Sequence, residues 1–448
     1  MSALFDPRRA SLATLTLLAL AAPGCAVDEP PAGQPASVSP APDAQVESWE
    51  ALDQMQRYVE DRVRPEHVRH AFRQPSGTWV DCVLVEQQPA LRDTGERLLP
   101  TPASPSEEAL SPEPSPERAG AEEEPDGDEA FLSGTVDQDG AARACPKGTI
   151  PVRRVQLADV ARFRRLEHYF RKHGAAPAPA YGPTEEHQYA HAANWSVSNL
   201  GAASWMNVWA PAVAKAGEFS LSQLWVTRGS GATLQTLEAG WQVAPGYFGD
   251  SKAHLFIYST SDGYTTNGGG CYNLDCNRFV QTSTSVVIGG ALTPSVAGGK
   301  QYAIRLLYAY DAGTKAWWLW ARKSTAATTD TAIGYYRPAL FHATGLGGTS
   351  PRAATIDFGG EIIDDRTLHA GHTTTDMGAG TYPASGNGRA AYQRNAMVKG
   401  TDGTWKNASL TRAVDNRYCY DLAGPSSDPA GWGTYFYFGG PGYGTNCQ

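Results

Sequence analysis

The sequence predicts a large all-β domain, an antiparallel sandwich or barrel, that follows a smaller N-terminal region of mixed helix and strand. Its 448 residues include 47 Gly, 31 Pro, 20 Tyr and 12 Trp, which are typical of turns and strands rather than of a helix bundle. Ten of the Trp lie beyond Pro183, where short alternating runs are separated by Gly-rich turns and no helix intervenes. The expected strands are 219–227, 234–243, 254–260, 302–310, 316–322, 355–363 and 435–438.

Residues 1–25 have the organisation of an export signal. Arg8 and Arg9 precede an apolar run at 12–22, which is too short to span a bilayer as a helix. The run leads to Gly24-Cys25, a pair that resembles the site at which bacterial lipoproteins are cleaved and acylated. We therefore expect an exported protein, extracellular, periplasmic or on the cell surface. Simple secretion and a lipid anchor at Cys25, as in an outer-membrane lipoprotein, both stay open.

A Pro/Ala-rich linker, 26–45, is expected to be extended and leads into an amphipathic helix. The helix is expected because apolar residues recur at helical spacing between charged ones. These apolar residues are Trp49, Leu52, Met55, Val59 and Val63. Residues 79–84 are expected to form a strand.

A second amphipathic helix is expected after Pro151, within the Arg-rich stretch 153–172. Its apolar face would carry Leu157, Val160, Phe163 and Phe170. Another Pro-containing linker, 174–184, then separates the N-terminal region from the β-rich part of the chain.

An acidic insert at 101–130 interrupts the N-terminal region. It holds ten acidic residues and one base, Arg118, and accounts for the whole net charge of −9, the balance of 37 Lys and Arg against 46 Asp and Glu. A Pro-rich stretch of this charge cannot bury apolar surface and is expected to be disordered. The rest of the chain is neutral overall and has no basic block, which argues against nucleic acid as the main partner.

Six cysteines remain when the one in the export signal is set aside, and an even number in an exported chain indicates disulfides. Sequence proximity favours the pairs Cys271–Cys276, Cys419–Cys447 and, across the acidic insert, Cys82–Cys145. A zinc site is disfavoured, because no CxxC pair occurs and thiols would be oxidised outside the cytoplasm.

Two of the expected strands carry a glutamate on their polar face beside a glycine. Alternation places Glu238 beside Gly240 in one strand and Glu361 beside Gly359 in the other. Two carboxylates converging on a concave sheet would form a general acid and base pair, because their repulsion keeps one protonated while the other stays ionised. The alternative is that both are solvated carboxylates on the outer face of a sandwich.

Other motifs point less clearly to chemistry. His187 and His191 have the i,i+4 spacing of a metalloprotease helix, but the Glu of H-E-x-x-H is absent, so no metal site is expected. No G-x-S-x-G elbow supports a serine nucleophile. The run Trp317-Trp318-Leu319-Trp320 would suit a non-catalytic carbohydrate-binding or adhesive sandwich, although core packing explains such aromatic residues better.

Six motifs in the β-rich part together resemble the neprosin family of glutamic endopeptidases. They are FSLSQLWV (219–226), LEAGWQVAP (237–245), LFIYSTSDGY (255–264), GCYNLDCNRFVQT (270–282), FGGEI (358–362) and WGTYFYFGGPG (432–442). The N-terminal region resembles the activation peptide of that family through VDCVLVEQQPAL (80–91) and ACPKGTIPVRR (144–154). The motifs follow one another in the family's order from about Trp79 to the C-terminus.

The resemblance implies an activation pro-domain at 46–173 and a catalytic domain at 185–448, built as a sandwich of two antiparallel sheets. The catalytic glutamates of the family fall on Glu238 and Glu361, and its disulfides agree with the pairs favoured by proximity. It further implies cleavage of proline-containing peptides or proteins, typically after proline, at acidic pH and without metal or other cofactor. The pro-domain would act as an intramolecular inhibitor until the linker 174–184 is cut.

Several details stay open at this point. The resemblance does not say which glutamate is the general base. Gln223 and Gln242 are candidate oxyanion donors, and either is equally well explained as structural. Asp357-Phe358 departs from the Glu-Trp that family members usually have, and Asp357 shares a strand face with Glu361.

Overall fold

The computed structural model describes residues 45–105, 144–172, 185–265, 270–322, 329–365, 371–428 and 431–448. All of them belong to one compact unit, Ala32–Gln448. The expected export signal with Cys25, the linker 174–184, most of the linker 26–45 and all but 101–105 of the acidic insert lie outside the described residues.

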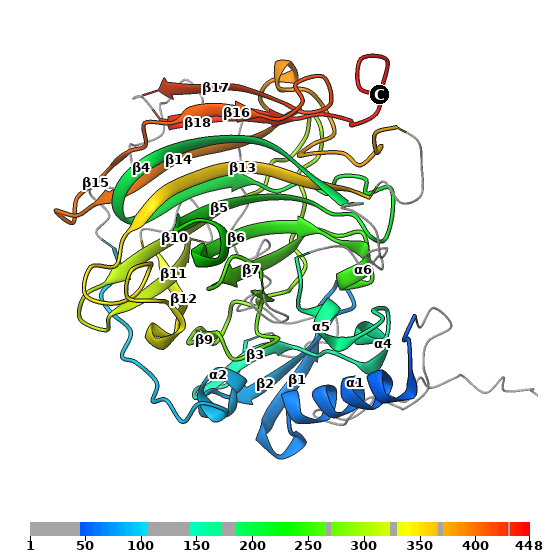
Figure 1. Ribbon diagram of the computed structural model, residues 1–448, viewed down its shortest axis with the longest axis vertical. Helices are drawn as coiled ribbons and strands as arrows, with labels where there is room; N and C mark the ends of the chain where they lie inside the picture. The colour runs from blue at the N-terminus through cyan, green and yellow to red at the C-terminus, as the bar shows by residue number, and fades with distance from the viewer. Residues whose placement is uncertain are drawn as a thin grey trace, which may run out of the picture. The chain divides into compact units, whose positions relative to one another are not determined.

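The N-terminal region, residues 45–105 and 144–172, is a small α+β unit and is drawn from blue to cyan-green in Figure 1. Its strands pair antiparallel in the order β1-β2-β3. The elements are α1 (Trp49–Arg62), η1 (Pro65–His67), β1 (Val68–Arg73), β2 (Trp79–Leu84), η2 (Val85–Gln87), α2 (Pro89–Arg92), β3 (Thr149–Arg153), α4 (Leu157–Val160) and α5 (Leu166–Tyr169). The expected first helix and the strand at 79–84 are thus confirmed.

The second expected helix is wrong as a single element, because the stretch 153–172 forms two separate turns of helix. α4 ends where the N–H of Ala161 returns to the carbonyl of Leu157, and Arg165 is extended with a φ of −139°. Phe163 lies in the break between the two turns and is 2% exposed. It is therefore buried, as its place on the expected apolar face predicts, although the helix does not continue through it.

The β-sandwich region, residues 185–448, contains strands that pair antiparallel throughout, together with the short helix α6 (Pro245–Phe248) and the turns η4 (Gly231–Thr233), η5 (Pro338–Leu340) and η6 (Pro383–Ser385). The strands are β4 (Glu185–Asn207), β5 (Ser220–Arg228), β6 (Gln235–Val243), β7 (His254–Thr260), β8 (Gly270–Tyr272), β9 (Phe279–Gln281), β10 (Ala303–Asp311), β11 (Ala316–Arg322), β12 (Thr331–Tyr336), β13 (Ala353–Asp365), β14 (Ala391–Gly400), β15 (Trp405–Asn407), β16 (Thr411–Val414), β17 (Asp421–Asp428) and β18 (Gly433–Gly439). All seven expected strands are present, with ends that differ by up to two residues.

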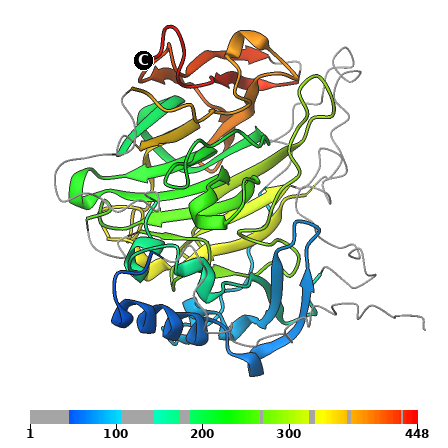
Figure 2. The same ribbon diagram turned by 90° about the vertical axis from the view of Figure 1, so that its right-hand side faces the viewer.

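The long strand β4 belongs to both layers of the sandwich. Its first half pairs with β13 and β16, which makes the order β8-β7-β6-β5-β13-β4-β16. Its second half pairs with β10 and β14, in the order β9-β12-β11-β10-β4-β14-β18-β17. Figures 1 and 2 show the two curled layers from two sides. We call the first layer the site sheet and the second the back sheet.

One buried apolar cluster fills the space between the two layers and includes Trp241 of the site sheet and Trp317 of the back sheet. On the opposite face of the site sheet, Phe219, Tyr258 and other aromatic residues form a cluster that Met55 of α1 joins. The N-terminal region therefore packs on the site sheet.

The aromatic run of β11 is core rather than a sugar-binding surface. Trp317, Trp318 and Trp320 are 1%, 0% and 3% exposed. The N-terminal region contributes to this packing, because Leu91 of α2 lies in the same cluster as Trp318 and Trp320. The observation that suggested a carbohydrate-binding sandwich is thereby removed.

The six cysteines pair as expected. The bonded pairs are Cys82–Cys145, Cys271–Cys276 and Cys419–Cys447, with Cα atoms 5.3, 6.4 and 5.0 Å apart. Three disulfides are compatible with the exported location that the N-terminus predicts. Among the described residues, no helix has the length and apolar character of a membrane span.

Candidate active site

Glu238 and Glu361 lie on two strands that flank β5 in the site sheet. β5 pairs with β6 on one side and with β13 on the other, and its Gln223 stands opposite Gly240 and Gly359. Because side chains alternate along a strand, both glutamates project from the same face as Gln223. That face is the one covered by the N-terminal region, and it carries no part of the core between the sheets.

The glycines beside the two glutamates allow the backbones to approach closely. A Cβ on Gly240 would stand 1.9 Å from the carbonyl oxygen of Ser222 and 2.7 Å from Cβ of Gln223. A Cβ on Gly359 would stand 2.5 Å from Cα of His191. Only glycine fits at these positions without a shift of the neighbouring strands.

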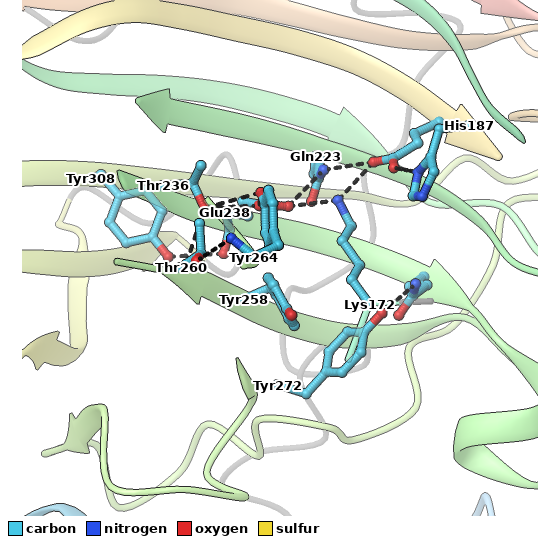
Figure 3. Close-up of polar contacts among 12 residues, drawn as sticks. Lys172, His187, Gln223, Thr236, Glu238, Tyr258, Thr260, Tyr264, Tyr272 and Tyr308 are labelled. Atoms are coloured by element: carbon cyan, nitrogen blue, oxygen red, sulfur yellow. Dashed lines mark hydrogen bonds and ion pairs between the residues drawn. The ribbon is translucent and has the colours of Figure 1, made fainter. Parts of the chain in front are cut away.

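A lysine from the N-terminal region joins the two carboxylates. Nζ of Lys172 lies 2.6 Å from Oε2 of Glu238 and 2.7 Å from Oε2 of Glu361. Lys172 follows α5 and is 6% exposed, and the glutamates are 0% and 1% exposed. Figure 3 shows Lys172 reaching up to the site sheet toward Glu238 and Gln223. The glutamates are therefore buried and paired in this structure, which contradicts the alternative of solvated carboxylates on an outer face.

Gln223 touches the same two oxygens from within the sheet. Its Nε2 donates to Oε2 of Glu238 at 3.2 Å and to Oε2 of Glu361 at 3.1 Å. The ammonium of Lys172 and the amide of Gln223 thus each contact both Oε2 atoms, which brings the two carboxylates together. The other candidate donor, Gln242, donates instead to the hydroxyl of Tyr272 at 3.1 Å and is not joined to either carboxylate by that contact.

The outer oxygens of the two glutamates have different partners. Oε1 of Glu238 accepts hydrogen bonds from the neutral hydroxyls of Tyr264 at 2.7 Å and Thr236 at 2.9 Å. Oε1 of Glu361 is 2.6 Å from Nδ1 of His187, which belongs to β4. Only Glu361 thus has a titratable base at its outer oxygen among the contacts that the described residues make.

The charges around Glu361 fix its ionisation. Burial raises the pKa of Glu361, but the ammonium of Lys172 and the imidazole of His187 outweigh burial and hold this pKa at about 2. Burial lowers the pKa of Lys172, yet Glu238 and Glu361 raise it overall. The lysine therefore stays charged and Glu361 stays ionised while they are in contact.

The histidines of the HQYAH motif lie on a strand and bind carboxylates. His187 and His191 project from one face of β4, because residues four apart in a strand share a face. His187 contacts Glu361, and Nδ1 of His191 is 2.5 Å from Oδ2 of Asp357. Burial lowers the pKa of His191, but the hydrogen bond to Asp357 raises it overall.

Four of the residues around the two glutamates, which we call the dyad, were not predicted from the sequence as members of the site. They are Lys172, His187, Thr236 and Tyr264. The i,i+4 spacing of the histidines was the visible indication of His187. The spacing was compared with a metalloprotease helix, whereas the two residues lie on a strand that brings His187 to Glu361. Thr236 shares the polar face of its strand with Glu238, which was visible in the alternation. Nothing local distinguishes Lys172, because its contacts depend on how the N-terminal region docks.

The model of the neprosin family matches residues 216–441, which is half of the chain and includes both glutamates. Among solved structures, SCP-B of the eqolisin family of peptidases, in complex with the tripeptide Ala-Ile-His, is 11% identical with a TM-score of 0.30. Scytalido-glutamic peptidase with a transition state analog inhibitor is also 11% identical, with a TM-score of 0.31.

Each of these two alignments covers 57% of this chain and 98% of the solved one. The match to the family model, together with the motifs around the two glutamates, identifies the family. The chain belongs to the neprosin family of glutamic-type peptidases.

Proposed function

We propose that the protein is the zymogen of an exported glutamic endopeptidase that hydrolyses peptide bonds after proline at acidic pH. The observation that carries the proposal is the convergence of Glu238 and Glu361 on one atom, Nζ of Lys172. Because both Oε2 atoms contact the same Nζ atom, the distance between them cannot exceed the sum of these two contact distances. A single water molecule in the place of the ammonium would therefore touch both carboxylates.

In this proposal Glu361 is the general base and Glu238 the general acid. After Lys172 leaves, Glu361 keeps His187 as a neighbour that favours its ionised form, and Glu238 keeps the hydroxyls of Thr236 and Tyr264. Repulsion between the two carboxylates then places the shared proton on Glu238.

Hydrolysis follows from this distribution of protons. Glu361 takes a proton from the water as its oxygen attacks the scissile carbonyl carbon, and Glu238 donates its proton to the carbonyl oxygen. When the tetrahedral intermediate collapses, the C–N bond breaks and Glu361 returns its proton to the leaving amine. Glu238 regains its proton from the hydroxyl of the intermediate, so both residues end as they began. Gln223 holds both Oε2 atoms in position during these steps.

Aromatic side chains beside the dyad support a preference for proline. Nζ of Lys172 lies 5.7 Å from the ring centroid of Trp225 and 6.0 Å from that of Phe219. A proline ring bound next to the scissile bond would pack on such flat apolar walls.

The position of Lys172 supports an inhibitory role for the N-terminal region. The ammonium fills the point at which the attacking water must stand and keeps Glu361 ionised. No peptide reaches the dyad while this contact persists. Activity would therefore require cleavage in the linker 174–184 and displacement of Lys172.

The test is a fluorogenic peptide with one internal proline, incubated with acid-treated full-length protein with and without a chelator. We expect cleavage after proline that the chelator does not reduce. Glu238→Gln and Glu361→Gln should each lower kcat by at least about a hundredfold, because each removes one proton-transfer group. The melting temperature serves as the folding control. If both folded variants cleave the peptide like the wild type, the proposed dyad is wrong.

A further inference from the structure

A second buried carboxylate of the β-sandwich region, Asp275, is bound by side chains of the N-terminal region. Asp275 lies between β8 and β9, inside the loop closed by Cys271–Cys276, and is 3% exposed. Nη2 of Arg62 in α1 is 2.8 Å from Oδ1 of Asp275, and the hydroxyl of Tyr169 donates to Oδ2 at 2.9 Å. The hydroxyl of Tyr58 donates to the backbone carbonyl of Asp275 at 2.8 Å.

The contact between Arg62 and Asp275 is an ion pair that is almost free of water. The side chains are 4% and 2% exposed. A charged pair of this kind is strongly disfavoured when one partner is removed, because the remaining charge is left buried without compensation. A second hydrogen bond fixes the guanidinium, since Nη1 of Arg62 donates to the carbonyl of Arg153 at 2.9 Å.

Activation, as proposed above, would leave Asp275 without the partners that come from the N-terminal region. Tyr247 of α6 remains, and its hydroxyl donates to Oδ2 of Asp275. Nδ2 of Asn273 in turn lies 3.4 Å from the hydroxyl of Tyr247. Oδ1, the oxygen that binds Arg62, would be open to a new cation.

The segment from Tyr169 to Lys172 connects Asp275 with the dyad and is short enough to imitate a bound peptide. Tyr169 contacts Asp275, and Lys172 contacts both glutamates. The Cα atoms of these two residues are at most about 10 Å apart, because they are three residues apart in the chain. Tyr272 lies along this path, with its ring centroid 4.6 Å from that of Tyr247 and 4.8 Å from that of Tyr258. Asp275 is therefore one end of the surface that begins at the catalytic glutamates.

We propose that Asp275 forms a substrate subsite for a positively charged side chain, arginine above all, about three or four residues from the scissile bond. Arg62 occupies this subsite in the zymogen as Lys172 occupies the dyad. Arginine suits the site better than lysine, because a guanidinium is the group that binds Oδ1 in the zymogen and its planar donors match a carboxylate better than an ammonium does. The proposal rests on the peptidase function proposed above.

The test uses acid-activated full-length protein and peptides that contain one proline. A single Arg is moved through the third and fourth positions on each side of the scissile bond, and each peptide has a partner with Gln in its place. At one position we expect kcat/KM to be about tenfold or more higher with Arg than with Gln. Asp275→Asn should reduce this ratio to about one, and the melting temperature of the variant serves as the folding control.

Asp250→Asn is the matched control, because Asp250 pairs with His254 within the β-sandwich region. It should keep the preference for Arg. The subsite is refuted if wild type shows no preference at any position, or if Asp275→Asn keeps the wild-type ratio. The second result would make Asp275 an anchor of the N-terminal region alone.

A binding measurement separates this proposal from the proposed function. The same peptides are titrated into Glu238→Gln protein whose linker 174–184 has been cut by added acid-activated wild type, with and without the added Asp275→Asn change. If the wild type cleaves no peptide but Arg peptides bind through Asp275, the peptidase assignment fails and the cation site stands. If Gln peptides are cleaved and Arg gives neither tighter binding nor faster cleavage, the subsite alone fails.

Discussion

At the scale of single residues, the partners of Oε1 distinguish the two glutamates. Glu238 has two neutral hydroxyl donors there, and Glu361 has His187. Lys172 touches both glutamates equally, so its removal does not cancel the difference. The imidazolium form of His187 would therefore keep Glu361 ionised in acid, the condition in which a carboxylate base is hardest to maintain.

Replacing His187 by Gln should move the acid limb of the pH profile of kcat/KM to higher pH. His187 lowers the pKa of Glu361, so its loss lets this pKa rise, and the base is protonated earlier as the pH falls. At a fixed pH on the acid limb, kcat/KM should fall about tenfold for every pH unit by which the limb moves, and activity above the limb should change little. The profile is measured with the proline peptide after acid activation.

His191→Gln is the control on the same strand and face, because its imidazole pairs with Asp357 rather than with the dyad. Its acid limb should stay where it is in the wild type. An unchanged acid limb in His187→Gln, or an equal displacement in both variants, would show that His187 does not act through Glu361.

At the scale of elements, β5 holds the strands of the two glutamates together. The amide of Gln223 spans from one carboxylate to the other because Gly240 and Gly359 lie on either side of it. The spacing of the dyad is therefore a property of three adjacent strands.

Gly240→Ala should lower both stability and kcat. The added Cβ would meet the carbonyl oxygen of Ser222 at 1.9 Å, so β5 and β6 must move apart. We expect a cost of about 1–3 kcal/mol in the free energy of unfolding and a displaced Gln223. Chemical denaturation and peptide kinetics measure the two effects.

Gly313→Ala is the matched control, because a Cβ there meets only the carboxylate tip of Asp311, at 3.4 Å. It should leave stability and kcat close to wild type. A Gly240→Ala variant with the stability and kcat of Gly313→Ala would contradict a close approach of β5 and β6 at this point.

Strands with a clear alternation of polar and apolar residues were predicted from the sequence, and strands without it were not. β6 and β13 alternate in polarity, so their existence and the faces of Glu238 and Glu361 were visible in the sequence. β4 was missed, although it is the longest strand, because its many Ala, Asn, Ser and Gly residues have low β propensity. Pairing on both edges stabilises it instead, and this tertiary effect also determines the place of His187.

At the scale of the whole molecule, the N-terminal region and the β-sandwich region share charges that acid can neutralise. While Lys172 is in place, the pKa of Glu361 is about 2, below the usual value near 4.3 for a glutamate. We call the state with Lys172 bound to the glutamates closed and the state without this contact open. Because the pKa of Glu361 is lower in the closed state, ionised Glu361 stabilises the closed state at pH values above its open-state pKa. This stabilisation is lost as the pH falls toward 2. Acid therefore favours the departure of Lys172.

Lys172→Gln should make the full-length protein active at a higher pH than the wild type. The amide cannot form the two ion pairs, so the closed state loses its charge contacts with the dyad. The wild type should activate faster as the pH falls from about 5 to about 3, whereas the variant should depend less on pH. Shortening of the chain and release of peptide fluorescence are followed together.

Lys147→Gln, an exposed lysine of the same region, should behave as the wild type. Identical activation profiles for Lys172→Gln and wild type would show that the contact with the dyad does not maintain latency.

The continuity of β4 has a consequence for how the protein unfolds. One half of the strand is an interior member of the site sheet and the other half is an interior member of the back sheet. If β4 leaves one layer, the same strand also loses its place in the other layer. The two sheets should therefore not unfold independently. Glu238, Glu361, His187 and the core between the sheets are thus expected to lose their structure in one cooperative transition, without a partly open form in which the site is intact.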